Sequence, residues 1–195
     1  MLVNSSNNSL TNRNEFIDFK GASNTENKVK RLRQNGQIQI YQSAYRGSYS
    51  NIIRDSLRNA ALGRKVLLIQ LMKGGVKQGV LNPIRLCGNL LWIRSSNSYE
   101  QHSKNNIMRN QDITSSIKDS ILEVWDFCKH QLLSGEQDQV IIDEIFRSIE
   151  LGIISEDDLI STLENRFISG DVILTGTTIP KKLLLMADQF TELRS

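Results

Sequence analysis

The pattern of apolar and polar positions predicts a strand, a loop, a helix and a second strand near the start of the ordered chain. Ile38 and Ile40 alternate with polar neighbours and lead into a loop over residues 42–50. The helix that follows has apolar residues at helical spacing and ends at Gly63. The apolar run 66–72, which shows no alternation, is typical of a parallel strand that is covered on both faces. A first strand that feeds a loop and a helix N-terminus is the usual arrangement for binding phosphate, because unpaired N–H groups and the helix dipole point at the ligand.

The same alternation of strands and helices continues through the rest of the chain. Further strands are predicted over residues 90–94, 139–144, 171–175 and 190–193. Helices are predicted over residues 112–133, 145–151 and 155–166, and again after Pro180. Ser155 is the predicted N-cap of the third of these helices. The expected fold class is therefore α/β, a three-layer, mostly parallel, doubly wound sheet in a single domain.

Composition and charge are those of an ordinary soluble protein. The 195 residues are 39% hydrophobic and 23% charged, and the formal net charge is +3. That charge is too small to argue for nucleic acid, and no nucleic-acid partner is expected. The chain has no apolar run of membrane-spanning length and no signal-peptide core at its start, so we expect no membrane partner and a cytoplasmic location.

The first 35 residues differ in composition from the remainder. Residues 1–35 are rich in Asn, Ser and charge, which predicts a disordered, basic N-terminal segment before a domain over residues 36–195. A short basic cluster precedes the first strand and consists of Lys28, Lys30, Arg31 and Arg33. We interpret it as a solvated tail, in preference to a flap that approaches an anionic ligand.

The cysteines and histidines favour structural roles. Cys87 and Cys128 show no paired-motif spacing, and we interpret both as reduced thiols in the core. His102 and His130 are too few for a His-rich metal site and are expected at the surface or at helix ends.

A second informative stretch is the predicted strand that ends in Asp143 and Glu144. Ionised carboxylates at the carboxyl end of a buried strand need partners or a cation to offset their lost hydration. In phosphate-binding α/β proteins that cation is Mg²⁺, held by an acid at a strand end. The alternative is an Asp that caps the next helix, with a solvated Glu beside it.

Taken together, these residues resemble the P-loop corrinoid adenosyltransferases, the ATP:cob(I)alamin (cob(I)yrinic acid a,c-diamide) adenosyltransferase family. The resemblance runs in a consistent order over about residues 37–194. The positions that carry it are 63–66, 70–74, 140–145, 151–154, Leu159, 163–166, 172–176, Pro180, 187–188 and 191–193.

This resemblance implies a P-loop NTPase-like fold and a transferase reaction. In the family, a Co(I) corrinoid attacks the 5′ carbon of ATP and tripolyphosphate leaves. It therefore implies ATP and Mg²⁺ as cofactors, a corrinoid substrate, small-molecule partners and compatibility with a homodimer. The nucleotide-binding residues implied by the resemblance are Arg46, Gly47, Ser48, Ser50, Lys73, Thr175 and Gly176. The implied metal-binding residues are Asp143 and Glu144, and no catalytic residue is assigned.

The loop over residues 42–50 departs from the family's Walker A pattern, T-G-x-G-K-G-K-T-T. Ser48 stands in place of the phosphate-binding Lys, and Tyr49 in place of the Mg²⁺-binding Thr. No register shift restores the Lys, because the chain has none between Lys30 and Lys65. A lost charge-assisted contact of this kind is worth roughly 1.5–3 kcal/mol.

Three hypotheses follow from these departures. The chain is an active, ATP-dependent adenosyltransferase with a remodelled loop, a catalytically inactive homologue that binds a nucleotide or another ligand as a regulatory or interaction protein, or an interaction module that has kept only the fold. The inactive reading predicts that Tyr45 and Tyr49 fill the site, with Tyr49 partly in the Mg²⁺ position. An open loop with Tyr49 turned to solvent would contradict it.

Overall fold

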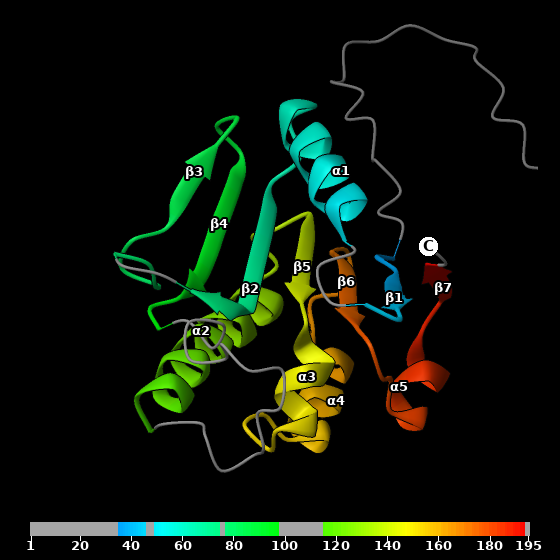
Figure 1. Ribbon diagram of the computed structural model, residues 1–195. Helices are drawn as coiled ribbons and strands as arrows, with labels where there is room; N and C mark the ends of the chain where they lie inside the picture. Colours follow the sequence, from blue (N-terminus) through cyan, green and yellow to red (C-terminus); the bar gives the residue numbers. More distant parts are fainter. Residues whose placement is uncertain (1–34, 46–48, 75–76, 98–114, 194–195) are drawn as a thin grey trace, which may run out of the picture. The chain divides into compact units, whose positions relative to one another are not determined.

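Seven strands form one sheet in the order β3–β4–β2–β5–β6–β1–β7 (Figure 1). The structure is a computed structural model that describes residues 35–45, 49–74, 77–97 and 115–193. The strands are β1 Ile38–Ser43, β2 Val66–Gly74, β3 Ile84–Leu86, β4 Leu90–Ser95, β5 Gln139–Asp143, β6 Asp171–Gly176 and β7 Gln189–Leu193. All of these residues belong to one unit, Arg33–Ser195. The predicted single α/β domain with a mostly parallel sheet is confirmed.

One pair of described strands departs from the parallel arrangement. β3 runs antiparallel to β4, whereas the other neighbouring pairs are parallel. The two strands are joined by a tight turn in which Cys87 and Gly88 both have positive φ. β3 was not predicted from the sequence, because its three residues are too few to show a periodic pattern.

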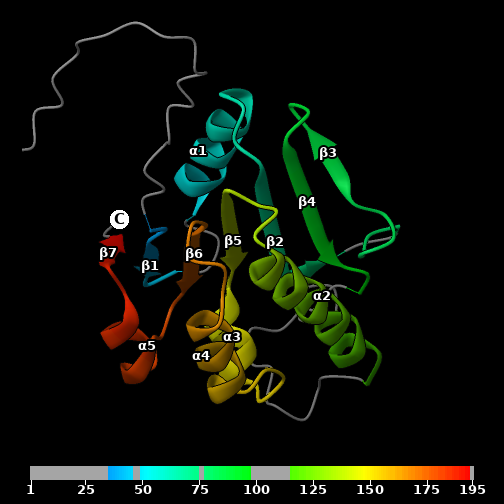
Figure 2. The same cartoon turned by 180° about the vertical axis from the view of Figure 1, so that it is seen from behind.

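The helices cover the two faces of the sheet unequally (Figures 1 and 2). They are α1 Ser50–Ala61, α2 Ser115–Ser134, α3 Ile145–Glu150, α4 Glu156–Glu164 and α5 Lys181–Met186. α2, α3, α4 and α5 contribute to the larger apolar cluster on one face, and α1 packs on the other face. Because both faces of the central strands are covered, these strands appear in the sequence as continuous apolar runs.

Most of the individual residues with an expected structural role lie where they were expected, and Cys87 does not. Trp125 and Cys128 are buried in the larger cluster, and the Ser155 hydroxyl accepts a hydrogen bond from the Asp158 N–H at 3.1 Å, as an N-cap does. Cys87 is exposed, so the prediction of a core thiol there was wrong. Its place in a turn at the edge of the sheet explains the exposure. His130 is exposed, as expected.

Some expectations concern residues outside the described ranges. These are the N-terminal segment up to residue 34, the loop residues Arg46, Gly47 and Ser48, and the stretch 98–114 with His102. Within the described ranges, the helices are all too short or too polar to cross a bilayer.

Candidate functional site

A row of polar side chains crosses the sheet near the carboxyl ends of four adjacent strands. Arg94 on β4, Gln70 on β2 and Asp143 on β5 are paired in register, and Thr175 on β6 continues the row. Side chains alternate along a strand, so these residues share a face with Leu68, two positions before Gln70, which packs beneath α1. The row therefore lies on the α1 side, at the edge where ligands bind in open α/β sheets.

Asp143 is the centre of this row. Its side chain is 4% exposed, and its carboxylate accepts hydrogen bonds from the Thr175 hydroxyl at 2.8 Å and the Gln70 side-chain amide at 2.8 Å. The Lys73 ammonium lies 3.6 Å from the carboxylate oxygen that Gln70 also contacts. A buried carboxylate needs such partners, because it has lost the water that would otherwise solvate it.

Gln70 is held in one orientation by donors on β4. Its side-chain oxygen accepts hydrogen bonds from the Trp92 indole at 3.0 Å and from Nε of Arg94 at 2.9 Å. An amide whose oxygen binds two donors must turn its NH₂ group the other way, toward Asp143. Gln70 thereby connects the carboxylate at the centre of the sheet to Arg94 at its side.

Glu144 lies next to this network at the start of α3. Its backbone N–H donates to the Thr175 hydroxyl oxygen at 2.9 Å, and its φ of 59° is in the left-handed region. Its side chain is 3% exposed. The alternative of a solvated Glu beside a capping Asp is therefore wrong. Both carboxylates are buried, and it is Glu144 that occupies the N-cap position of α3.

Tyr49, the residue before α1, points its side chain toward the end of β6, next to the Asp143 network. Its side chain is 2% exposed, and its hydroxyl donates a hydrogen bond to the Gly176 carbonyl oxygen at 2.7 Å. Burial and the negative charge of Asp143 raise the pKa of Tyr49 to about 12, with a smaller contribution from Glu144. The phenol is consequently neutral at physiological pH and acts as a donor.

Gly176, at the end of β6, is required by close packing. A Cβ at this position would lie 2.6 Å from a ring carbon of Phe146 on α3. The absence of a side chain lets β6 and α3 approach, and this leaves the Gly176 carbonyl within reach of Tyr49.

The predicted site residues are brought together in part. Lys73, Asp143, Glu144, Thr175 and Gly176 all contribute to this edge of the sheet. Ser50 is exposed as the first residue of α1. Arg46, Gly47 and Ser48 lie outside the described residues, so their assigned roles stay predictions. The burial of Tyr49 agrees with the expectation that it turns inward. Tyr45 is 65% exposed, so the expectation that it also fills the site was wrong.

Three further members of the site, Gln70, Trp92 and Arg94, were not predicted from the sequence. A signal was present for Gln70, because it is the one polar residue within the apolar run 66–72. A buried polar residue at the end of a central strand needs hydrogen-bond partners, and these partners lie on the neighbouring strands.

Asp143 and Tyr49 fit a Mg²⁺ ion poorly. Both oxygens of Asp143 are already engaged, by Thr175 on one side and by Gln70 and Lys73 on the other. Tyr49 offers a neutral phenol that binds a carbonyl, where Mg²⁺ prefers anionic or carbonyl oxygens and water.

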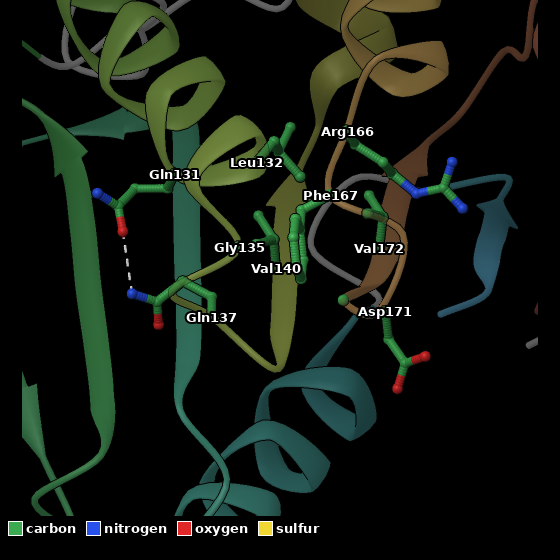
Figure 3. Close-up of a pocket in the computed structure, with 10 residues that line it drawn as sticks. Gln131, Leu132, Gly135, Gln137, Val140, Arg166, Phe167, Asp171 and Val172 are labelled. Atoms are coloured by element: carbon green, nitrogen blue, oxygen red, sulfur yellow. Dashed lines mark hydrogen bonds between the residues drawn. The ribbon is translucent and has the colours of Figure 1, made fainter. Parts of the chain in front are cut away.

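A separate small pocket lies at the opposite end of β5 and β6, where these strands begin (Figure 3). It is lined by Leu132, Gly135, Val140, Phe167 and Val172 among others, and Gln131 accepts a hydrogen bond from Gln137 beside it. Its volume of about 10 Å³ holds one water molecule at most. The pocket is therefore too small to be a substrate site.

Comparison with known proteins identifies the family. The family model described as ATP:corrinoid adenosyltransferase BtuR/CobO/CobP matches residues 34–195. The chain is 26% identical over 178 residues to the uncharacterized protein all2391 of Nostoc sp. (strain PCC 7120), which covers 85% of this chain and 46% of that protein. It is 24% identical over 161 residues to the corrinoid adenosyltransferase of Escherichia coli (strain K12), and that alignment covers 83% of this chain and 78% of that enzyme.

The chain thus spans about half the length of the Nostoc relative. The match to the family model covers all of the described residues, and the seven-stranded sheet with flanking helices agrees with it. The chain belongs to the ATP:corrinoid adenosyltransferase family.

Proposed function

We propose that this chain is a ligand-binding member of the family that acts as a regulatory or interaction protein and does not transfer an adenosyl group from MgATP. The observation that carries the proposal is the inward position of Tyr49. Its phenol binds the Gly176 carbonyl at 2.7 Å and lies beside the acids that would hold the metal. The ring takes the place that Mg²⁺ and the phosphates would need.

The chemistry of the loop before α1 supports the same proposal. Phosphate positioning and charge neutralisation are most of what such a loop contributes to catalysis. The chain lacks a Lys between Lys30 and Lys65, and two glycine positions of the family pattern are Ser43 and Tyr45. The N-cap of α1 is Tyr49, whose side chain makes no capping hydrogen bond.

A retained ligand site is supported by the intact network around Asp143. A protein that kept only the fold has no need for a buried carboxylate, and buried ionic groups cost stability unless they are well paired. Asp143 nonetheless keeps three polar partners, among them the partly exposed cation Lys73. We therefore favour ligand binding over a plain interaction module.

Adenosyl transfer is the second candidate, and the grouping of Asp143, Lys73 and Thr175 favours it. In that reaction the Co(I) electron pair forms a cobalt–carbon bond to the 5′ carbon of ATP. The bond from that carbon to oxygen breaks, and tripolyphosphate leaves with the bonding electrons.

Anaerobic adenosylation of cob(I)alamin with MgATP separates the two candidates. Product formation is followed by the absorbance change of the light-sensitive cobalt–carbon bond, for the wild-type chain, Asp143→Asn and the exposed α2 control Asp119→Asn. We expect all three to match the reaction without protein. Turnover by the wild-type and Asp119→Asn chains that Asp143→Asn abolishes would overturn the proposal and establish the transferase.

A further inference from the structure

We propose that Arg94 and Lys73 form a phosphate-binding subsite at the carboxyl ends of β4 and β2. This deepens the proposed function, because it names the ligand class that the retained site takes. The inference starts from Arg94, which lies two strands away from Asp143 and is outside the loop and strand ends that the family resemblance points to.

Arg94 is held in place by two separate contacts. Its Nε–H donates to the Gln70 side-chain oxygen at 2.9 Å, and its guanidinium carbon lies 4.2 Å from the centre of the Trp92 ring. The Trp92 indole donates to the same Gln70 oxygen at 3.0 Å. Gln70 and Trp92 together hold the Arg94 guanidinium in one orientation, so the Arg94 side chain has little conformational entropy left to lose when a ligand binds.

The terminal nitrogens of Arg94 keep their donors for a ligand. Among the described residues, the contacts of its guanidinium group are those with Gln70 and Trp92, and its side chain is partly exposed. No described Asp or Glu forms an ion pair with it, in contrast to Arg64 and Arg147. A planar, fixed and unneutralised fork of N–H donors matches two oxygens of one phosphate group.

Lys73 supplies a second cation at the same place. Its neighbour Gly74 pairs with Ser95, the residue after Arg94, so the two cations stand at the ends of adjacent strands. The Lys73 ammonium lies 3.6 Å from Asp143, which is ion-pairing distance but too long for a hydrogen bond. Its N–H donors are therefore available, and its side chain is 27% exposed.

The two cations together favour a phosphate over a single carboxylate. Both converge on Gln70, since Lys73 shares the Asp143 oxygen that Gln70 binds and Arg94 holds the Gln70 oxygen. Two cations and the Asp143 carboxylate thus lie around Gln70, and the buried Glu144 follows Asp143 in the chain. Two cations at adjacent strand ends match a phosphate group, which carries more than one negative charge near neutral pH. Binding at this subsite does not require a metal ion, because the cations are the protein's own.

The two tryptophans of the chain make the test direct. Trp92 touches Arg94, whereas the Trp125 indole donates to Asp158 on the opposite side of the sheet. The two indole N–H signals in a ¹⁵N-labelled sample are followed while inorganic pyrophosphate is added, with EDTA present. Trp92→Phe assigns the signals. Citrate and sulfate at equal ionic strength serve as polyanions that lack phosphorus.

We expect pyrophosphate to shift the Trp92 signal in a saturable way and to leave Trp125 in place. Arg94→Met should weaken binding at least tenfold, and Arg94→Lys should weaken it less, because Lys keeps the charge but not the fork. Arg85→Met on neighbouring β3 is the control and should bind as the wild type does, since Arg85 is an exposed arginine that pairs with Leu91 and therefore lies on the opposite face of the sheet from Arg94. An unchanged Trp125 signal shows that each variant is folded.

Three results would overturn the proposal: no saturable shift, equal binding by Arg94→Met, or citrate or sulfate that binds as tightly as pyrophosphate. These results are independent of the adenosylation assay. If pyrophosphate does not bind, the proposed ligand site could still take another class of ligand. Turnover in the adenosylation assay would overturn the proposed function but would not bear on phosphate binding by Arg94.

Discussion

The hydroxyl of Tyr49 donates a hydrogen bond to the backbone oxygen of Gly176 across 2.7 Å, and this contact joins the start of α1 to the end of β6. The two residues are 127 positions apart in the sequence. Their contact places an aromatic ring near Asp143, at the residue that the sequence resemblance aligns with the metal-binding Thr of the family. The raised pKa of Tyr49 follows from the same position.

Tyr49 should make the protein less stable at high pH. Its pKa is near 10 in an unfolded chain and about 12 in the folded protein. Below pH 10 both states hold the proton, so the phenol contributes no pH dependence. Between about pH 10 and pH 12 the unfolded state ionises first, and the free energy of unfolding falls by up to roughly 3 kcal/mol. Urea unfolding at a series of pH values measures this fall.

The matched variants for this measurement are Tyr49→Phe and Tyr45→Phe. Tyr49→Phe should be less stable by about 1–2 kcal/mol at neutral pH, because the buried Gly176 oxygen loses its donor. Its stability should then decline less than that of the wild type above pH 10. Tyr45 is 65% exposed, so its replacement should change neither quantity. If the stability of the wild type and of Tyr49→Phe declined equally with pH above pH 10, the phenol of Tyr49 would not be buried as described.

Asp143→Asn should destabilise the protein by about 1–3 kcal/mol. The NH₂ group of the new Asn would face another donor, either the Gln70 amide or the Thr175 hydroxyl, both of which donate to the carboxylate in the wild type. Lys73 would also lose its counter-ion. Asp119 is exposed on α2, so Asp119→Asn should change stability by less than about 0.5 kcal/mol. Denaturant midpoints of the two variants give the comparison. Equal midpoints would mean that the carboxylate is solvated.

The contact between Gly176 and Phe146 can be tested with a double-mutant cycle. Gly176→Ala places a Cβ against the Phe146 ring and should cost about 1–3 kcal/mol. Phe146→Ala is itself destabilising, but the double variant should lose less than the sum of the two single losses, because the ring carbon nearest to the new Cβ is removed. Additive losses in thermal unfolding would exclude the clash as the cause.

The two thiols should differ in reactivity. Cys87 is exposed, and Cys128 is fully buried, which raises the pKa of its thiol. One thiol per chain should react with an aromatic disulfide reagent in the native protein, and the second should react after denaturation. Cys87→Ser should abolish the native reaction. Reaction of both thiols in native protein would contradict the packing of α2 against the sheet.

Strand ends were the part of the site that the sequence could predict. Asp143, Thr175 and Lys73 each follow an apolar run, and parallel strands bring such ends to one edge. Gln70 and Arg94 were missed, because their roles depend on which way long side chains turn between neighbouring strands. The exposure of Tyr45 could not be predicted for a related reason, since a loop side chain has no periodic pattern that fixes its direction.

The same limits apply to the fold. Long apolar runs and helical spacing predicted six of the seven strands, because burial on both faces leaves a clear mark on composition. The short edge strand β3 and the exposure of Cys87 depend on a tight turn in which Cys87 and Gly88 both have positive φ. Non-glycine residues such as Cys rarely adopt positive φ, so the sequence does not indicate this turn.

Calorimetric titration of the wild-type chain with ATP, once with Mg²⁺ and once with EDTA, shows whether the site needs a metal ion. We expect that Mg²⁺ does not tighten binding, because Tyr49 takes the metal's place and the cations of the site belong to the protein. Tyr49→Thr, which removes the ring, should respond to Mg²⁺ more strongly than the wild type. The opposite result would be wild-type binding that Mg²⁺ tightens at least tenfold and that Asp143→Asn abolishes. It would contradict the proposed function and favour a MgATP-dependent transferase.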